Sequence, residues 1–265
     1  QMSKQIGLIK LKGNIGGISF YRAGGEDLAK AANGPSKEKI LNHPAFIRTR
    51  ENNTEFGVSA TAGKAVRLAL VTAIQTTGDA RLASRLTKLF KEINLRGVGV
   101  RGQRPITLTA NKSMLENFDF NAAISFSSVF NAPFSFSSDP SRLQSTITVP
   151  AFVPSSFIAA PAGATHFRLF QAIGMVSDYV YNASTLHFDS TDPTLNTIGA
   201  IEYSAMTDLN SAVPVPLTIV TVLPGAPIMT ATISVVQCVG IEIFQRTGGV
   251  DYLLAQGSCM KVVKL

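Results

Sequence analysis

The hydrophobic period of this 265-residue chain changes near residue 105. Before that point, apolar residues recur three and four positions apart, the spacing of one face of a helix. Beyond it, apolar and polar residues alternate in short runs rich in Ser and Thr, which is the pattern of half-buried strands. A chain with one period after the other is expected to fold as an α+β protein.

The second part of the chain carries about eight strand-like runs separated by turn signals such as Asp192-Pro193, Pro224-Gly225 and Gly248-Gly249. The runs are 118–130, 134–138, 145–149, 166–176, 179–188, 198–205, 217–223, 228–244 and 252–265. Short strands at such intervals predict an antiparallel β-sandwich over residues 105–265, either Ig-like or jelly-roll.

Short strands are also predicted at the beginning of the chain. Residues 6–12 alternate as I-G-L-I-K-L-K, and glycine pairs at 16–17 and 24–25 flank the aromatic pair Phe20-Tyr21. Glycine supplies the positive φ of tight turns, so two or three short antiparallel strands are expected in a β-hairpin arrangement. Such a hairpin is marginal alone and must pack on its own chain or a neighbour's.

Helices are expected between residues 36 and 96. Ser36 is a typical N-cap for a short helix, and Pro44 marks a second start. Residues 60–74 have helical spacing, and Asp79 precedes a third helix with leucines on one face. An αα-hairpin therefore joins the first strands in a basic N-terminal module, residues 1–104. The connector 95–105, L-R-G-V-G-V-R-G-Q-R-P, has no phosphate-loop spacing.

Charge is scarce and unevenly placed. Charged residues make up 15% of the chain, against roughly 25% in a typical soluble domain. Residues 1–104 hold 18 Lys and Arg against 7 Asp and Glu, and residues 105–265 hold 6 against 10. A surface with few charged groups loses little hydration free energy when it is buried against another protein. Attraction between the basic residues 1–104 of one copy and the acidic residues 105–265 of another favours association between copies.

The sequence offers no convincing catalytic or metal site. Its three histidines, His43, His166 and His187, have no acidic residue or cysteine at ligand spacing, and no Gly-x-Ser-x-Gly motif is present. We therefore expect no enzyme activity, no metal and no cofactor. Cys238 and Cys259 lie in apolar runs and are interpreted as small buried hydrophobes, with one bridge between neighbouring strands left open.

The first residues, Gln-Met-Ser-Lys-Gln, lack the apolar core of a signal peptide, and no run reaches the length of a membrane span. We expect synthesis in the cytoplasm and no membrane span. The final location of the protein stays open.

Three segments are distinctive: K-G-N-I-G-G-I-S-F-Y at 12–21, S-K-E-K-I at 36–40 and H-P-A-F-I-R-T-R-E-N-N-T-E-F-G at 43–57. Together they resemble a family of uncharacterised bacterial proteins. A-P-A-G-A-T-H-F-R-L at 160–169 is similar to it as well. This family shares the N-terminal pattern ahead of a variable β-rich region, and the resemblance implies no activity. His43 stands where the resemblance leads us to expect an Asp, so no helix-capping role is expected for its side chain.

These observations favour a structural protein that assembles with copies of itself, as a homo-oligomer or filament. The predicted interface lies around the segment 42–57, where Arg48, Arg50, Glu51 and Glu55 would bridge to the sandwich or to a neighbouring subunit. Its residues are Phe20, Tyr21, Phe46, Arg48, Arg50, Glu51, Glu55 and Phe56.

Two alternatives remain open. The basic module could bind nucleic acid, through Lys10, Lys12, Arg22, Arg48, Arg50, Arg101 and Arg104. The sandwich loops could bind a glycan or another ligand, although the chain has no Trp to offer a sugar.

Overall fold

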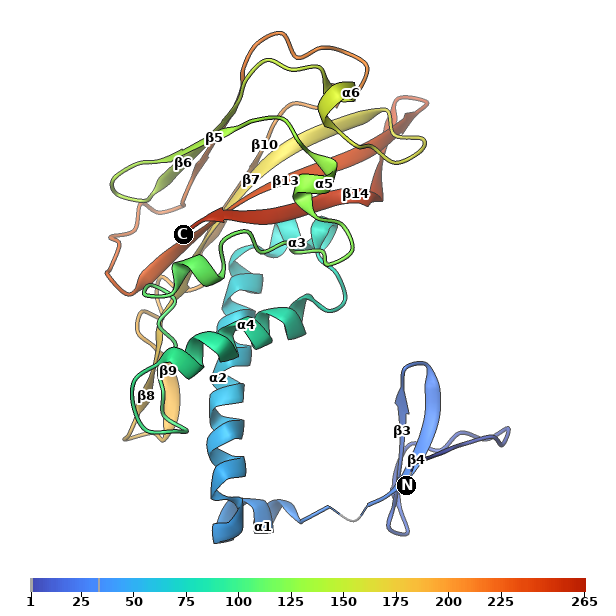
Figure 1. Cartoon of the computed structure of the whole chain (residues 1–265), viewed down its shortest axis with the longest axis vertical. Helices are drawn as coiled ribbons and strands as arrows, with labels where there is room; N and C mark the ends of the chain where they lie inside the picture. The colour runs from blue at the N-terminus through green and yellow to red at the C-terminus, as the bar shows by residue number, and fades with distance from the viewer. Residues whose placement is uncertain (1, 33) are drawn as a thin grey trace. The chain divides into compact units, whose positions relative to one another are not determined.

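A computed structural model describes residues 2–32 and 34–265 of the chain (Figure 1). The protein is mixed α and β with several antiparallel sheets, as expected. Its contacts divide it into two units, residues 1–50 and 51–265. This division lies away from the predicted boundary at 104/105, because the helices after residue 50 share a core with the C-terminal strands.

The first unit contains a four-stranded antiparallel sheet in the order β1-β4-β3-β2. Its strands are β1 (Met2–Lys4), β2 (Gly13–Ile15), β3 (Ile18–Ala23) and β4 (Glu26–Ala31). The predicted antiparallel arrangement is confirmed, and the paired glycines form the turns that join β2 to β3 and β3 to β4.

Residues 6–12 lie outside the strands of this sheet, contrary to the prediction from their alternation. The side chain of Gln5 explains the difference. Its Oε1 accepts from the Leu11 N–H at 2.8 Å, and its Nε2 donates to the Leu11 carbonyl at 3.2 Å. These bonds close the segment into a loop between β1 and β2, so its backbone does not extend along a neighbouring strand.

Two short helices follow, α1 (Lys37–Asn42) and the 3-10 helix η1 (Pro44–Phe46). Ser36 caps α1 as predicted, since its Oγ accepts from the Lys39 N–H at 3.2 Å. The expectation that His43 has no capping role is wrong. Its Nδ1 accepts from the Ala45 N–H at 3.2 Å, because an unprotonated imidazole nitrogen is an acceptor with reach similar to an Asp oxygen.

The long helices are α2 (Ile47–Ala69), α3 (Val71–Thr77) and α4 (Leu82–Arg96). The helix predicted over 60–74 is therefore interrupted at Leu70, whose φ of −113° and ψ of 23° are not helical. Leu70 is buried in the core, and α2 and α3 meet there at an angle of 89°. The turn places α3 against the strands β13 and β14.

The largest sheet has five strands in the order β10-β7-β13-β14, with β11 also paired to β7. Its strands are β7 (His166–Ser177), β10 (Gly199–Tyr203), β11 (Thr207–Asp208), β13 (Ile233–Thr247) and β14 (Val250–Lys264). A three-stranded sheet contains β5 (Ser135–Ser138), β6 (Gln144–Val149) and β12 (Leu217–Val222), and a hairpin contains β8 (Tyr179–Asn182) and β9 (His187–Ser190).

The alternating run 118–130 is not a strand. It contains turns and the one-turn helix α5 (Phe126–Val129), whose Ser125 cap accepts from the Ser128 N–H at 3.2 Å. Asp119 also accepts from the Phe126 N–H, which fixes the start of the turn. The remaining short helices are η2 (Lys112–Met114) and α6 (Pro154–Phe157).

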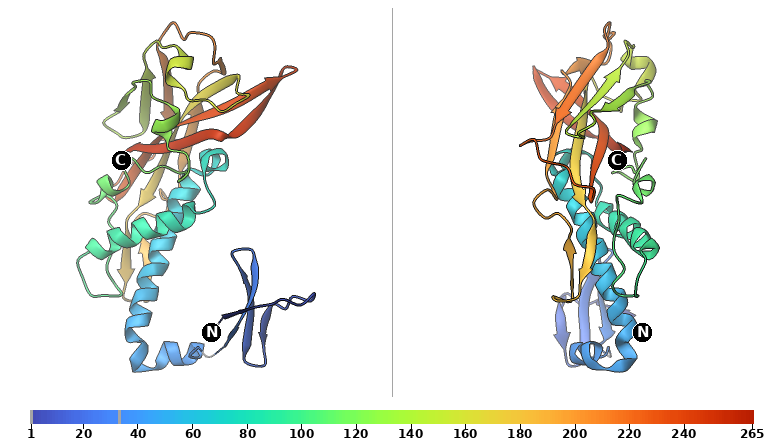
Figure 2. Two further views of the ribbon diagram at one scale, coloured as in Figure 1. Left: turned by 45° about the vertical axis from the view of Figure 1, so that its right-hand side comes forward. Right: turned by 90° about the vertical axis from the view of Figure 1, so that its left-hand side faces the viewer.

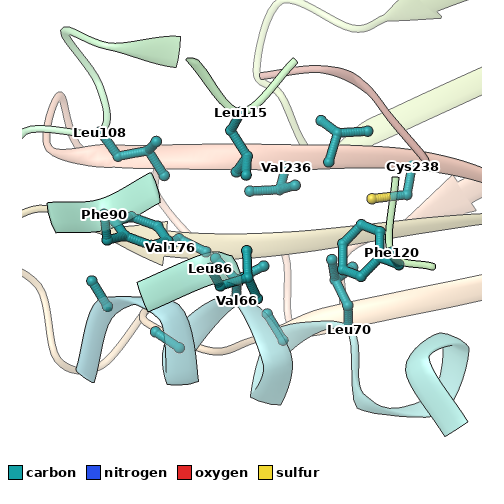
Figure 3. Packing of buried hydrophobic residues seen from close by; sticks show 14 of the residues in the cluster. Val66, Leu70, Leu86, Phe90, Leu108, Leu115, Phe120, Val176, Val236 and Cys238 are labelled. Atoms are coloured by element: carbon teal, nitrogen blue, oxygen red, sulfur yellow. The ribbon is translucent and has the colours of Figure 1, made fainter. Parts of the chain in front are cut away.

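Both faces of the five-stranded sheet are covered. On one face, Val176 and Val236 pack with Val66 and Leu70 of the α2 region and with Leu86 of α4 (Figure 3). On the other face, Leu169 and Ile241 share a cluster with Ile147 and Ile219 of the three-stranded sheet. Because the sheet is covered on two sides, most residues of β7 and β13 are buried, including the polar Gln171 and Gln237.

The two cysteines are free and buried in different clusters. Cys238 belongs to the helix-facing cluster, and Cys259 belongs to the cluster shared with the three-stranded sheet. Their interpretation as small buried hydrophobes is confirmed. Burial raises the pKa of the Cys259 thiol to about 12, so the protonated, uncharged form is strongly favoured.

Candidate functional site

Glu55 lies at the centre of an ion cluster that joins α2 to α4 and to the connector. Its carboxylate accepts from Arg104 Nε at 2.8 Å and from Arg104 Nη2 at 2.7 Å. Lys91 Nζ donates to Oε2 at 2.5 Å, and the Gly102 N–H donates to Oε1 at 2.8 Å. The side chain is 1% exposed, so its charge is balanced entirely inside the second unit.

This cluster changes the acidity of Glu55. Burial by itself would raise the pKa of the carboxyl, but the hydrogen bonds from Arg104, Lys91 and Gly102 outweigh it and lower the pKa to about 2. The same pairing raises the pKa of Arg104. Both groups are therefore charged at neutral pH, and their role in this geometry is to hold three segments of the chain together.

Glu51 lies one turn before Glu55 and is also matched by a cation. Its Oε2 is 3.6 Å from Arg101 Nε. The like-charge pair Glu51 and Glu55 is thus accommodated because connector arginines face both carboxylates. Arg50 in the first unit has other partners, since its Nη1 donates to the carbonyls of Ile40 and His43 at 2.9 and 3.0 Å.

The predicted interface residues are therefore not gathered at one place. Glu51 and Glu55 bind the connector, Arg50 binds the end of α1, Phe46 is half-buried and Arg48 is exposed in the first unit. Phe20 and Tyr21 lie half-buried on β3. Phe56 is 54% exposed on α2.

The four-stranded sheet has a different character from this cluster. No described residue of β1, β2, β3 or β4 is buried. Its side-chain contacts are exposed or half-buried: Lys4 pairs with Glu26 at 2.5 Å, Arg22 lies 4.0 Å from Asp27, and Tyr21 donates to the Met2 sulfur at 3.0 Å. Its neighbouring loop exposes Ile6 at 94% and Ile9 at 81%. Large exposed apolar residues of this region are Met2, Ile6, Leu8, Ile9, Leu11, Ile15 and Ile18.

The cations proposed for nucleic acid fall into two groups. Arg101 and Arg104 face the carboxylates of Glu51 and Glu55, so a phosphate would compete with an ion pair already formed. Lys10, Lys12, Arg22 and Arg48 lie in the first unit and are exposed, and Arg50 of the same unit donates to backbone carbonyls. Phosphate binding would therefore rest on the first unit alone.

The histidines are dispersed. His166 Nε2 lies 3.0 Å from Arg246 Nη1, and His187 is exposed at the start of β9. Within residues 2–32 and 34–265, no group of three or more His, Cys, Asp or Glu side chains is arranged to hold a metal ion.

No family model matches the chain, and no curated protein or solved structure is similar to it. In the part of the chain that the structure describes, no single helix is long and apolar enough to cross a membrane. The pair 44–69 and 71–77 satisfies length and composition only when its two bent members are taken together.

Two features of the site were missed from the sequence. Lys91 and Gly102 bind Glu55 from 36 and 47 positions away, and their spacing carries no motif. The exposure of Ile6, Leu8, Ile9 and Leu11 was not predicted, because the alternation of residues 6–12 was interpreted as a strand of the hairpin.

Proposed function

We propose that this chain is a non-enzymatic structural protein that associates with copies of itself, as a homo-oligomer or filament. The observation that carries the proposal is the four-stranded sheet without a buried residue, together with its loop of exposed Ile6, Leu8 and Ile9. A sheet of this size needs an apolar face that is covered to be stable. A second copy is the simplest cover.

Edge pairing supplies the geometry. Both edge strands of the sheet, β1 and β2, are three residues long and leave backbone donors and acceptors open to a neighbouring strand. The alternating segment 6–12 has the pattern of a strand and could add to an edge of another copy. The basic front and the acidic second part of the chain would then attract each other between subunits.

The finer architecture belongs to the same proposal. The five-stranded and three-stranded sheets share one apolar cluster, which supports the two layers of an antiparallel β-sandwich. The resemblance to a bacterial family with a common N-terminal pattern agrees with a shared front that carries the association.

The test compares size in solution for the native protein and for a variant with Ile6→Ser, Leu8→Ser and Ile9→Ser. We expect the native protein to be oligomeric by light scattering and negative-stain imaging at micromolar concentration, and the variant to be monomeric. The matched control replaces two exposed valines of the connector, Val98→Ser and Val100→Ser, and should stay oligomeric. A native protein that is monomeric at every salt concentration would overturn the proposal.

A further inference from the structure

The second unit carries an apolar groove between α2 and α4. Figure 2 shows α4 crossing α2, and the pairs Glu55–Lys91 and Gly63–Leu86 show that the numbering rises along α2 as it falls along α4. The helices are closest at Gly63, where an added Cβ would lie 3.2 Å from Leu86 Cβ. Beside this crossing the groove opens to about 600 Å³.

The walls of the groove are two helical stripes. Phe56, Ala60 and Arg67 line it from α2, and Ala83, Thr87 and Lys88 are among the residues that line it from α4. From Phe56 to Arg67 the α2 wall extends about 16 Å, or roughly three helical turns. A groove of this length on the α2 side can take a short helix laid along α2.

The rim of the groove is basic. Arg67 and Lys88 line it with Lys91, which is already paired with Glu55, and Glu92 is the acidic residue of the lining. The Nε of Arg67 is buried without a hydrogen-bond partner among the described residues. Residues 51–104 as a whole hold 9 Lys and Arg against 4 Asp and Glu.

We propose that this groove binds an amphipathic helix with acidic side chains, supplied by a different protein. Apolar side chains of the helix would contact Phe56 and Ala60, and its carboxylates would face Arg67 and Lys88. The basic rim selects an acidic partner, and the apolar floor selects an amphipathic peptide over the phosphates of a nucleic acid. The N-terminal segment of a second copy does not fit, because it carries Lys10 and Lys12.

The probe is a fluorescein-labelled helical peptide of about 14 residues, long enough for the groove, with leucines along one face and glutamates on the other. Binding is followed by fluorescence anisotropy with the full chain carrying the triple serine change in residues 6–9, so that self-association does not contribute. We expect the peptide to bind, and a counterpart with lysine in place of every glutamate not to bind.

Two variants locate the binding. Phe56→Ser and Lys88→Glu should each weaken it about tenfold, the loss typical of a central contact. Lys64→Glu, the same charge change at an exposed position of α2 outside the groove, should not. Circular dichroism verifies that all three are folded.

Equal binding to the native protein and the Phe56→Ser variant would overturn the proposal, as would no binding of the acidic peptide. So would displacement of the peptide by an equal concentration of oligothymidylate, which would assign the groove to nucleic acid. Because the triple serine variant is used, failure of this proposal leaves the self-association proposal intact.

Discussion

The two main antiparallel sheets of this chain are stabilised in different ways. In β7 and β13 nearly every side chain is buried, with helices on one face and a second sheet on the other. In β1 to β4 no described side chain is buried, and the sheet is held by backbone hydrogen bonds, glycine turns and solvent-exposed contacts such as the Lys4–Glu26 ion pair. The difference teaches that the large sheet has its apolar surface covered by its own chain, whereas within the first unit the small sheet has no such cover.

The strongest way to break this comparison is to weaken the large unit at its ion cluster. Glu55→Gln removes the charge that faces Arg104 and Lys91, and it leaves both cations without a counter-ion. We expect a loss of about 3 kcal/mol in the free energy of unfolding, the lower end for a broken buried pair because Arg104 and Lys91 are partly exposed. Urea denaturation followed by circular dichroism measures it.

The matched control for this change is Glu92→Gln, an exposed residue of α4 with no ion pair among those described. It should stay within about 0.5 kcal/mol of the native protein. If Glu55→Gln and Glu92→Gln had the same free energy of unfolding, the ion cluster would not stabilise the large unit.

Acid should produce a loss of similar size in the native protein. The folded pKa of Glu55 is about 2, below its ordinary 4.5, so its contribution is present above pH 4.5 and is lost as the pH falls toward 2. The shift corresponds to about 3 kcal/mol. Asp79, whose pKa is also lowered, adds to this loss, whereas Asp178, whose pKa burial raises, acts in the opposite sense. Between pH 4.5 and 2, the free energy of unfolding should fall more steeply with decreasing pH for the native protein than for Glu55→Gln. Equal slopes would refute the lowered pKa of Glu55.

A smaller effect is expected from crowding the large sheet at Gly240. A Cβ added there would lie 2.0 Å from the Cζ atom of Phe170, whose ring is buried. We expect Gly240→Ala to cost about 2 kcal/mol through overpacking, measured by thermal unfolding. Gly7→Ala is the comparison in the first unit, where the nearest atom is 3.9 Å away, and it should be close to neutral. Equal melting temperatures for the two variants would contradict the conclusion that the large sheet is tightly packed at Gly240 and the first unit is open at Gly7.

The smallest effect on stability is expected at Leu8, in the loop beside the first sheet. Leu8 is fully exposed, so Leu8→Ser should change the unfolding free energy of the dilute protein by less than about 0.5 kcal/mol. The same change should weaken association, which light scattering measures across a dilution series. A large loss of stability in the dilute protein would mean that Leu8 supports the fold of its own chain.

Local signals predicted much of the fold. Ser36 marked the start of α1, and the runs 166–176 and 217–223 marked strands that form with nearly those limits. These features depend on residues a few positions apart, which a period or a cap reveals. The run 118–130 failed for the same reason, because Ser and Phe alternate there while Ser125 and Asp119 bind backbone groups and turn the chain.

Distant partners could not be predicted. Glu55 was singled out as an ion in need of a partner, yet its match to Arg104 joins positions 49 apart and exists only once α2 and the connector are folded. The break at Leu70 likewise depends on a buried side chain whose core comes from later strands. Charge and period indicated which residues needed partners but not which partners they would have.

The strand register also orders events in time as the chain is made. β3 pairs with β4 across a tight turn, whereas His166 at the start of β7 pairs with Phe244 at the far end of β13. The first sheet can close on the ribosome while the central strand of the large sheet still waits for its neighbour. A nascent chain would thus complete its first sheet while the core of the large sheet still lacks β13 and β14.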